Sequence, residues 1–110
     1  MKIGVRSEDV RLCNQLAIMC NENNFKIIFI NENDDVINNI DYVVIDMDTD
    51  IDSAVEKCSE YNKIKAMVFG VITMPTKSII LRAKDAGCLI VLTRSNFSAN
   101  LSDIIKKQIK

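Results

Sequence analysis

The sequence has no histidine, so chemistry in this chain depends on other side chains, among them carboxylates, guanidiniums, hydroxyls and thiols. Without histidine, Cys-His nucleophiles, Ser-His-Asp triads and most structural zinc sites lack an essential part. The four cysteines, Cys13, Cys20, Cys58 and Cys88, include no Cys-x-x-Cys pair. We therefore expect all four to be reduced, and we expect Cys13 and Cys20 to pack as small core residues of a helix.

Carboxylates are densest in an alternating run, which consists of Asp46, Asp48, Asp50 and Asp52. A calcium loop needs a glycine for its tight turn and a closing glutamate, and this run has neither. We therefore expect a solvated loop there. The turn from Val5 to Glu8 contains no glycine either, which excludes a phosphate-binding P-loop and a dinucleotide fingerprint at the start of the chain.

Five apolar runs, rich in Val and Ile, predict the strands that position these side chains. The runs are continuous rather than alternating, which is typical of strands covered on both faces. They extend from Ile3 to Val5, Phe25 to Ile30, Tyr42 to Ile45, Ala66 to Val71 and Leu89 to Leu92.

Segments of helical length or period separate the runs and follow the last one. Ser7 predicts the cap of a first helix that extends to about Asn21, with one apolar stripe formed by Val10, Cys13, Leu16, Ala17 and Cys20. The piece from Asp34 to Asn39 has room for only a turn or two, so the second helix is short.

Three further helices are expected after the third run. The third helix is marked by Ile51, Val55 and Cys58, and Pro75 with Thr76 opens a fourth that ends at Gly87. The last helix is marked by Leu101, Ile104, Ile105 and Ile109.

Strand and helix thus alternate five times within 110 residues, which predicts one α/β domain over residues 1–110. Right-handed crossovers then give a doubly wound parallel sheet of flavodoxin-like order 2-1-3-4-5. Ligand sites in such sheets lie at the carboxyl ends of the strands, near the switch between the first and third strands. The candidate residues there are Arg6, Ser7, Asp46, Thr73, Thr93 and Arg94.

The segment from Tyr42 to Asp48, together with Ala86-Gly87-Cys88 and Leu92-Thr93-Arg94, resembles the receiver domain of bacterial response regulators. The likeness covers nearly the whole chain. It implies that Asp46 stands at the phosphoacceptor position. It also implies that Arg94, seven residues after Gly87, stands where the family has its invariant lysine.

The departures from this family concern the chemistry itself. Receivers carry two adjacent carboxylates after the first strand, which hold Mg²⁺, whereas this chain has Arg6 and Ser7 there. A weak alternative metal set consists of Glu8, Asp9 and Asp48, and it requires the alignment to slide by two residues. Thr73 fits the position of the family's hydroxyl only with a one-residue deletion, and Val91 holds the position of its aromatic switch residue.

Two interpretations fit a carboxylate at the switch point with arginines on neighbouring strand ends. Arg6 could form a partly buried salt bridge that neutralises Asp46, or Arg6 could replace the metal in a permanently assembled site. Both predict no phosphoryl chemistry. Either way, we expect Asp46 to pair with Arg6 or Arg94, because a carboxylate partly removed from water needs a compensating charge.

The resemblance and its departures together predict an atypical receiver-like signalling domain that acts as a protein–protein interaction module and is not an enzyme. One alternative is a working phosphoacceptor receiver of a two-component system that uses Asp46, and only this alternative requires Mg²⁺ as a cofactor. A second alternative is a small structural subunit of the same fold.

The expected contact surface, called here the partner face, consists of Ile79, Ile80, Leu81 and Val91. The first three span about 200° of a helix, so at least one lies outside the core. The last helix adds a charged rim with Lys106, Lys107 and Lys110. We expect a protein partner or a homodimer there.

Charge and hydropathy exclude other partners for this domain. The net charge is −1, and no basic run favours nucleic acid. The longest mainly apolar stretch, Ala66 to Met74, is well short of the roughly 18 residues that cross a bilayer, so no membrane partner and a cytoplasmic location are expected.

Overall fold

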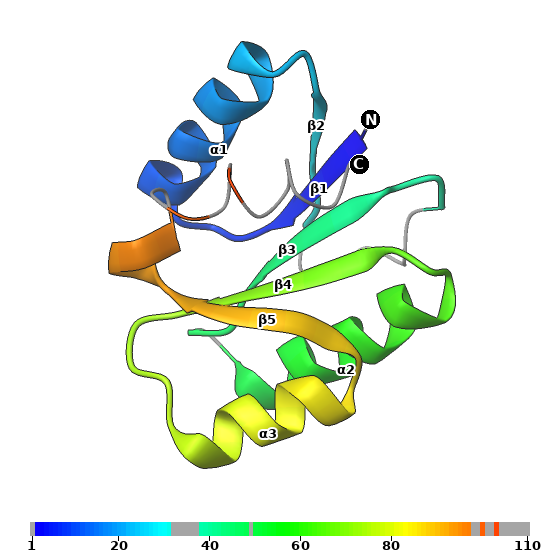
Figure 1. The fold of residues 1–110 in the computed structure, drawn as a ribbon, viewed down its shortest axis with the longest axis vertical. Helices are drawn as coiled ribbons and strands as arrows, with labels where there is room; N and C mark the ends of the chain where they lie inside the picture. The colour runs from blue at the N-terminus through cyan, green and yellow to red at the C-terminus, as the bar shows by residue number, and fades with distance from the viewer. Residues whose placement is uncertain (1, 32–37, 49, 98–99, 101–102, 104–110) are drawn as a thin grey trace.

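The computed structural model describes residues 2–31, 38–48, 50–97, 100 and 103. The strands are β1 (Lys2–Arg6), β2 (Lys26–Phe29), β3 (Tyr42–Asp46), β4 (Met67–Ile72) and β5 (Cys88–Thr93) (Figure 1). The helices are α1 (Val10–Glu22), α2 (Ile51–Lys63) and α3 (Lys77–Asp85). Each of the five apolar runs of the sequence therefore lies on a strand, and the helices expected third and fourth are α2 and α3.

The five strands form one parallel sheet of order β2-β1-β3-β4-β5. This confirms the α/β fold class and the flavodoxin-like strand order. Figure 1 shows α1 on one face of the sheet and α2 with α3 on the other. The connection after β1 leads to β2 on one side of it, and the connection after β2 returns to β3 on the other side. The switch point therefore lies between β1 and β3, at their carboxyl ends.

Burial on both faces explains why the strand runs are continuous. All five residues of β3 are buried. Val44 packs in the cluster that includes Leu12 and Leu16 of α1, whereas Val43 and Ile45 pack in the cluster of α2 and α3. Because successive side chains of a strand point to opposite faces, β3 needs apolar residues at every position except its end.

The start of α1 differs from the prediction. Asp9 caps the helix, because its Oδ1 accepts the backbone N–H groups of Arg11 and Leu12. Ser7 is therefore not the cap, and its hydroxyl donates instead to Asp46.

The apolar stripe of α1 shifts with its start. The buried residues are Leu12, Leu16 and Cys20, spaced four apart, and Cys13 is half-buried. Val10 lies about 200° around the helix from Leu12 and is 71% exposed. The expectation that Val10 lines the core is therefore wrong.

Of the signals that bound the other two described helices, Thr76 and Gly87 were predicted and Asp50 was not. The side chains of Asp50 and Thr76 cap α2 and α3. Gly87 follows α3 with a φ of 101°, where a Cβ would lie 2.3 Å from Cγ of Asn62. Only glycine fits this turn without strain, so α3 must end there.

Two expected helices cannot be compared with the structure in full. Residues 34–37 of the short second helix lie outside the described residues, as do Leu101, Ile104, Ile105, Ile109 and the three rim lysines of the last helix. Residues 94–97 after β5 are helical. Among the described residues, no helix has the length and apolar character needed to span a membrane.

Candidate functional site

Asp46 is the last residue of β3 and is buried, with its side chain 6% exposed. Its Oδ2 accepts the hydroxyl of Ser7 at 2.7 Å and an Nη2–H group of Arg94. Its Oδ1 accepts the backbone N–H of Asp48 at 3.0 Å. Both oxygens of the carboxylate therefore already have protein donors, which compensates for its removal from water.

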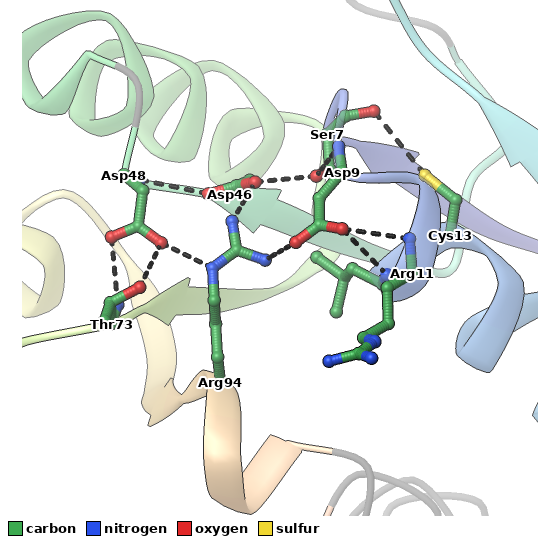
Figure 2. A network of polar contacts seen from close by, with 9 residues as sticks. Ser7, Asp9, Arg11, Cys13, Asp46, Asp48, Thr73 and Arg94 are labelled. Atoms are coloured by element: carbon green, nitrogen blue, oxygen red, sulfur yellow. Dashed lines mark hydrogen bonds and ion pairs between the residues drawn. The ribbon is translucent and has the colours of Figure 1, made fainter.

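Arg94 lies just after β5 and joins three carboxylates with one guanidinium (Figure 2). Its Nε donates to Asp48 Oδ2 at 2.6 Å, its Nη1 to Asp9, and its Nη2 to Asp46. We call these four residues the Arg94 cluster. The planar fork of arginine suits this arrangement, because each of its nitrogens points N–H groups in a fixed direction.

Each carboxylate of the Arg94 cluster also holds another element of the fold. Asp9 caps α1, and Asp46 binds Ser7 in the loop after β1. Asp48 accepts both the backbone N–H and the hydroxyl of Thr73 after β4, each at 2.9 Å. The cluster therefore connects the carboxyl ends of β1, β3, β4 and β5 and the start of α1.

The charges within the cluster stabilise one another. Burial alone would raise the pKa of Asp48, but the hydrogen bonds from Thr73 and Arg94 outweigh it and hold that pKa below its usual value. Burial likewise disfavours the charged form of Arg94, yet its bonds to Asp48 and Asp46 raise its pKa. The carboxylates therefore favour the charged form of Arg94.

The other predicted site residues are distributed around this cluster. Arg6 is buried, and its Nη2 donates to Ser53 Oγ of α2 at 3.0 Å. Of the two arginines that the sequence offers as partners of Asp46, Arg94 forms the ion pair. Glu8 is exposed, and Thr73 contacts Asp48 through the bonds described above.

The acidic run is exposed at Asp48, Asp50 and Asp52, as the sequence predicted, but each of its carboxylates also has a partner in the fold. Asp46 and Asp48 belong to the Arg94 cluster, Asp50 caps α2, and Asp52 pairs with Arg82 of α3. The roles of Asp9 and Asp48 as ligands of Arg94 were not foreseen. The sequence grouped Asp9 with Asp48 only in the weak alternative metal set, and it held no signal that either residue binds Arg94.

Mg²⁺, which the resemblance to receiver domains implies, does not fit these residues. The oxygens that face the centre of the cluster accept N–H groups of Arg94, and a guanidinium offers no ligand to a metal ion. Among the described residues, no three acidic, thiol or imidazole side chains are arranged to hold a metal ion.

A cavity of about 370 Å³ lies beside the cluster, between the start of α1 and the turn after β5. Its lining consists of Asp9, Arg11, Leu12, Gln15, Arg94 and Ser95. Asp46 is not part of this lining. A molecule in the cavity would touch the guanidinium of Arg94 rather than the phosphoacceptor-position carboxylate.

The partner face is partly apolar and partly open. Ile79, Ile80 and Val91 are half-buried, whereas Leu81 is 55% exposed. The expectation that at least one of the three consecutive residues of α3 lies outside the core is confirmed by Leu81. Leu89 of β5 is also exposed.

No model of a protein family matches the sequence, and no curated protein matches it. Solved structures with similar folds do exist. A response regulator from Thermotoga maritima is 14% identical with a TM-score of 0.82, and the match covers 96% of this chain and 94% of that chain. An orphan response regulator of H. pylori is 15% identical with a TM-score of 0.79, and the match covers 100% of this chain and 97% of that chain.

A third similar structure carries a different description. It is a protein described as a pilus assembly protein from Burkholderia thailandensis, 17% identical with a TM-score of 0.74, and the match covers 97% of this chain and 96% of that chain. At these identities the comparisons establish the fold. This chain therefore has the fold of a response-regulator receiver domain.

Proposed function

We propose that this chain is an atypical receiver-like signalling domain of the cytoplasm that binds a protein partner without phosphoryl transfer. It is an interaction module rather than an enzyme, and it needs no cofactor. The receiver fold supports the signalling role, and the contacts of Asp46 support the absence of phosphoryl chemistry.

The arrangement around Asp46 is the observation that carries this proposal. A phosphoacceptor carboxylate must present an oxygen to the incoming phosphorus, with a cation that neutralises the charge of the transferred group. Oδ2 of Asp46 already accepts hydrogen bonds from Ser7 and Arg94, and Oδ1 accepts one from the backbone N–H of Asp48. The positive charge of Arg94 is shared among three carboxylates, so little of it is left for a phosphoryl group.

The absence of phosphoryl transfer has a direct test. The chain is incubated with acetyl phosphate and Mg²⁺, and its intact mass is then measured, with Asp46→Asn treated in parallel. We expect the mass of both proteins to stay unchanged. Stoichiometric gain of one phosphoryl group, lost in Asp46→Asn, would establish the working phosphoacceptor alternative instead.

The interaction role is assigned to the partner face. Leu81 places an apolar side chain in solvent on α3, and Val91 lies on the neighbouring edge strand β5. Without a phosphoryl switch, binding at this face is constitutive. The expected partner is another protein or a second copy of this chain.

The partner face is tested with two matched substitutions. Leu81→Glu puts a charge on the partner face, and Ile18→Glu puts one on the outer face of α1, where Ile18 is 60% exposed. Sedimentation and affinity capture from the native cell should show that Leu81→Glu abolishes association and Ile18→Glu does not. Association that is lost equally in both variants, or kept in both, would show that the partner face is not the contact surface.

The structural-subunit alternative is favoured by one observation, the similarity of fold to the protein described as a pilus assembly protein. A structural subunit would associate stably with an assembly. Association that survives cell lysis and extensive dilution would favour it, whereas reversible binding favours the signalling module.

A further inference from the structure

The cavity of about 370 Å³ beside the Arg94 cluster has no role in the proposed function. Arg94 and Ser95 line it from the turn after β5, and the rest of its lining belongs to α1 and the cap of that helix. Arg11, Gln15 and Ser95 are exposed, so the cavity lies at the surface of the molecule. Its volume is near the lower end of the range of pockets that bind small molecules.

Arg11 brings an uncommitted cation to this cavity. Its backbone N–H donates to Asp9 Oδ1 at 2.9 Å, as part of the cap of α1. Within the described part of the chain, its guanidinium has neither an ion pair nor a hydrogen bond. In Figure 2 its side chain extends on the same side of Asp9 as the stem of Arg94. The charge of Arg11 is therefore available to a ligand in the cavity.

Asp9 and Arg94 keep hydrogen-bonding capacity of opposite kinds at the same place. Asp9 Oδ1 accepts the backbone N–H groups of Arg11 and Leu12, whereas Oδ2 accepts Arg94 alone among the described residues. A carboxylate oxygen has two lone pairs, so Oδ2 has room for another donor. Arg94 gives one N–H from each of its nitrogens to a carboxylate, and each of its terminal nitrogens carries a second N–H.

The balance of charge around the cavity favours a molecule that carries both signs. The Arg94 cluster sets three carboxylates against one guanidinium, so a purely anionic ligand would approach a net negative cluster. A purely cationic ligand would meet the guanidiniums of Arg11 and Arg94 in the lining itself. A zwitterion avoids both penalties, because its anionic end can pair with Arg11 while its cationic end faces Asp9.

We propose that this cavity binds a free amino acid. The carboxylate of the amino acid accepts N–H groups of Arg11, whose planar fork matches its two oxygens, and the ammonium group donates to Asp9 Oδ2. Leu12 is the one apolar residue among the described residues of the lining, whereas the amide of Gln15 and the hydroxyl of Ser95 can each donate or accept. The lining therefore favours an amino acid with a polar side chain.

A ligand at this place would act on the start of α1 and on the Arg94 cluster. Asp9 both caps α1 and binds Arg94, so the ligand would add a contact where these elements join. Because the unfolded chain lacks the cavity, binding stabilises the folded domain in proportion to the occupancy of the site. This inference goes beyond the proposed function and depends neither on phosphoryl chemistry nor on the partner face. Either can therefore fail without the other.

The first experiment measures the melting temperature of the purified full chain with each of the standard L-amino acids in turn, at millimolar concentration. We expect a rise with one or a few amino acids that have polar side chains. The matching carboxylic acid without the amino group, and the matching amine without the carboxylate, should give no rise. No rise with any amino acid, or an equal rise with an analogue that carries a single charge, would overturn the proposal.

A variant then places the ligand. Arg11→Ala removes the cation from the cavity without breaking a contact of the described residues, so it should fold as the original chain does. Calorimetric titration with the stabilising amino acid should show an affinity reduced about tenfold or more, the effect of losing a hydrogen bond to a charged group. Arg82→Ala, the same substitution on α3, is the matched control and should bind with unchanged affinity. Unchanged affinity in Arg11→Ala, or an equal loss in Arg82→Ala, would show that the amino acid does not bind in this cavity.

Discussion

The Arg94 cluster and the buried thiols of Cys58 and Cys88 are two sets of reactive side chains in this domain, and they differ in how burial of their polar groups is compensated. In the cluster, charged groups are partly buried, and each carboxylate accepts N–H groups of Arg94. The two thiols are almost fully buried and belong to one apolar cluster. Buried charges need compensation and thiols do not.

This difference determines where reactivity remains. At the sheet edge, hydrogen bonds from Ser7, Arg94 and the backbone of Asp48 compensate the charge of Asp46, and we propose that this compensation leaves the carboxylate unreactive. The thiols of Cys58 and Cys88 need no counter-charge to fold, and they keep their capacity to be oxidised.

The largest expected effect comes from removing the cation of the cluster. Arg94→Ala should reduce the free energy of unfolding by about 2 to 3 kcal/mol, because the nearly buried Asp46 then loses its counter-charge. Urea denaturation measures this. The control is Arg82→Ala, which breaks the exposed pair with Asp52 and should cost less than about 1 kcal/mol.

A second measurement on Arg94→Ala distinguishes a lost charge from lost packing. Asp9, Asp46 and Asp48 would face one another without a cation, so millimolar Ca²⁺ should raise the melting temperature of the variant more than that of the original chain. Equal stability losses for Arg94→Ala and Arg82→Ala would show that the cluster contributes no more than a surface pair.

The next effect is the coupling within each region. A double-mutant cycle of Arg94→Ala with Asp46→Asn should give a coupling of about 1 to 3 kcal/mol, because both residues lose their shared interaction in either single variant. The corresponding cycle of Cys58→Ala with Cys88→Ala should give less than about 1 kcal/mol, since both thiols pack in the core as small apolar groups. Couplings of equal size would contradict the contrast drawn between the two regions.

The fold and the location of the site could be predicted from the sequence because they depend on local patterns. The apolar runs identified all five strands, and their alternation with helices gave the sheet order that put Asp46, Thr73 and Arg94 at one edge. These features follow from strand burial and from the handedness of crossovers.

The choice between Arg6 and Arg94 could not be predicted in this way. Arg6 pairs in register with Ile45, and its bond to Ser53 places it on the α2 side of the sheet. Asp46 follows Ile45 and points to the opposite face, as Val44 does. Near a strand end, a shift of one residue moves a side chain to the other face of the sheet. Strand ends are also the least certain part of a sequence-based assignment.

The sequence did not predict that Cys58 and Cys88 belong to one buried cluster, for a different reason. They lie on a helix and a strand that are distant in the chain and come together only in the folded domain. Spacing rules for cysteines describe neighbours within a loop or a helix, so they do not detect such a cluster.

The smallest expected effect is a change of stability in acid. It distinguishes the two regions with a substitution that leaves every cation in place. In the folded chain the pKa of Asp48 lies below its usual value, so its ionised form stabilises the fold. This contribution is complete above the unfolded pKa of about 3.9 and is lost as the pH falls through the lower folded value. Asp48→Asn should therefore be less stable than the original chain by about 1 kcal/mol at neutral pH, since Asp48 is 28% exposed.

The stability difference between the two proteins should shrink below about pH 4, as the carboxylate of the original chain becomes protonated. Urea denaturation at several pH values between neutral and strongly acidic measures it. Cys58→Ala is the control from the thiol region, because no group that it removes titrates in acid, and its stability difference should not shrink in the same window. A difference for Asp48→Asn that persists unchanged in acid would mean that the asparagine disturbs the bonds to Thr73 by its shape, and the charge of Asp48 would then have no part in holding Arg94.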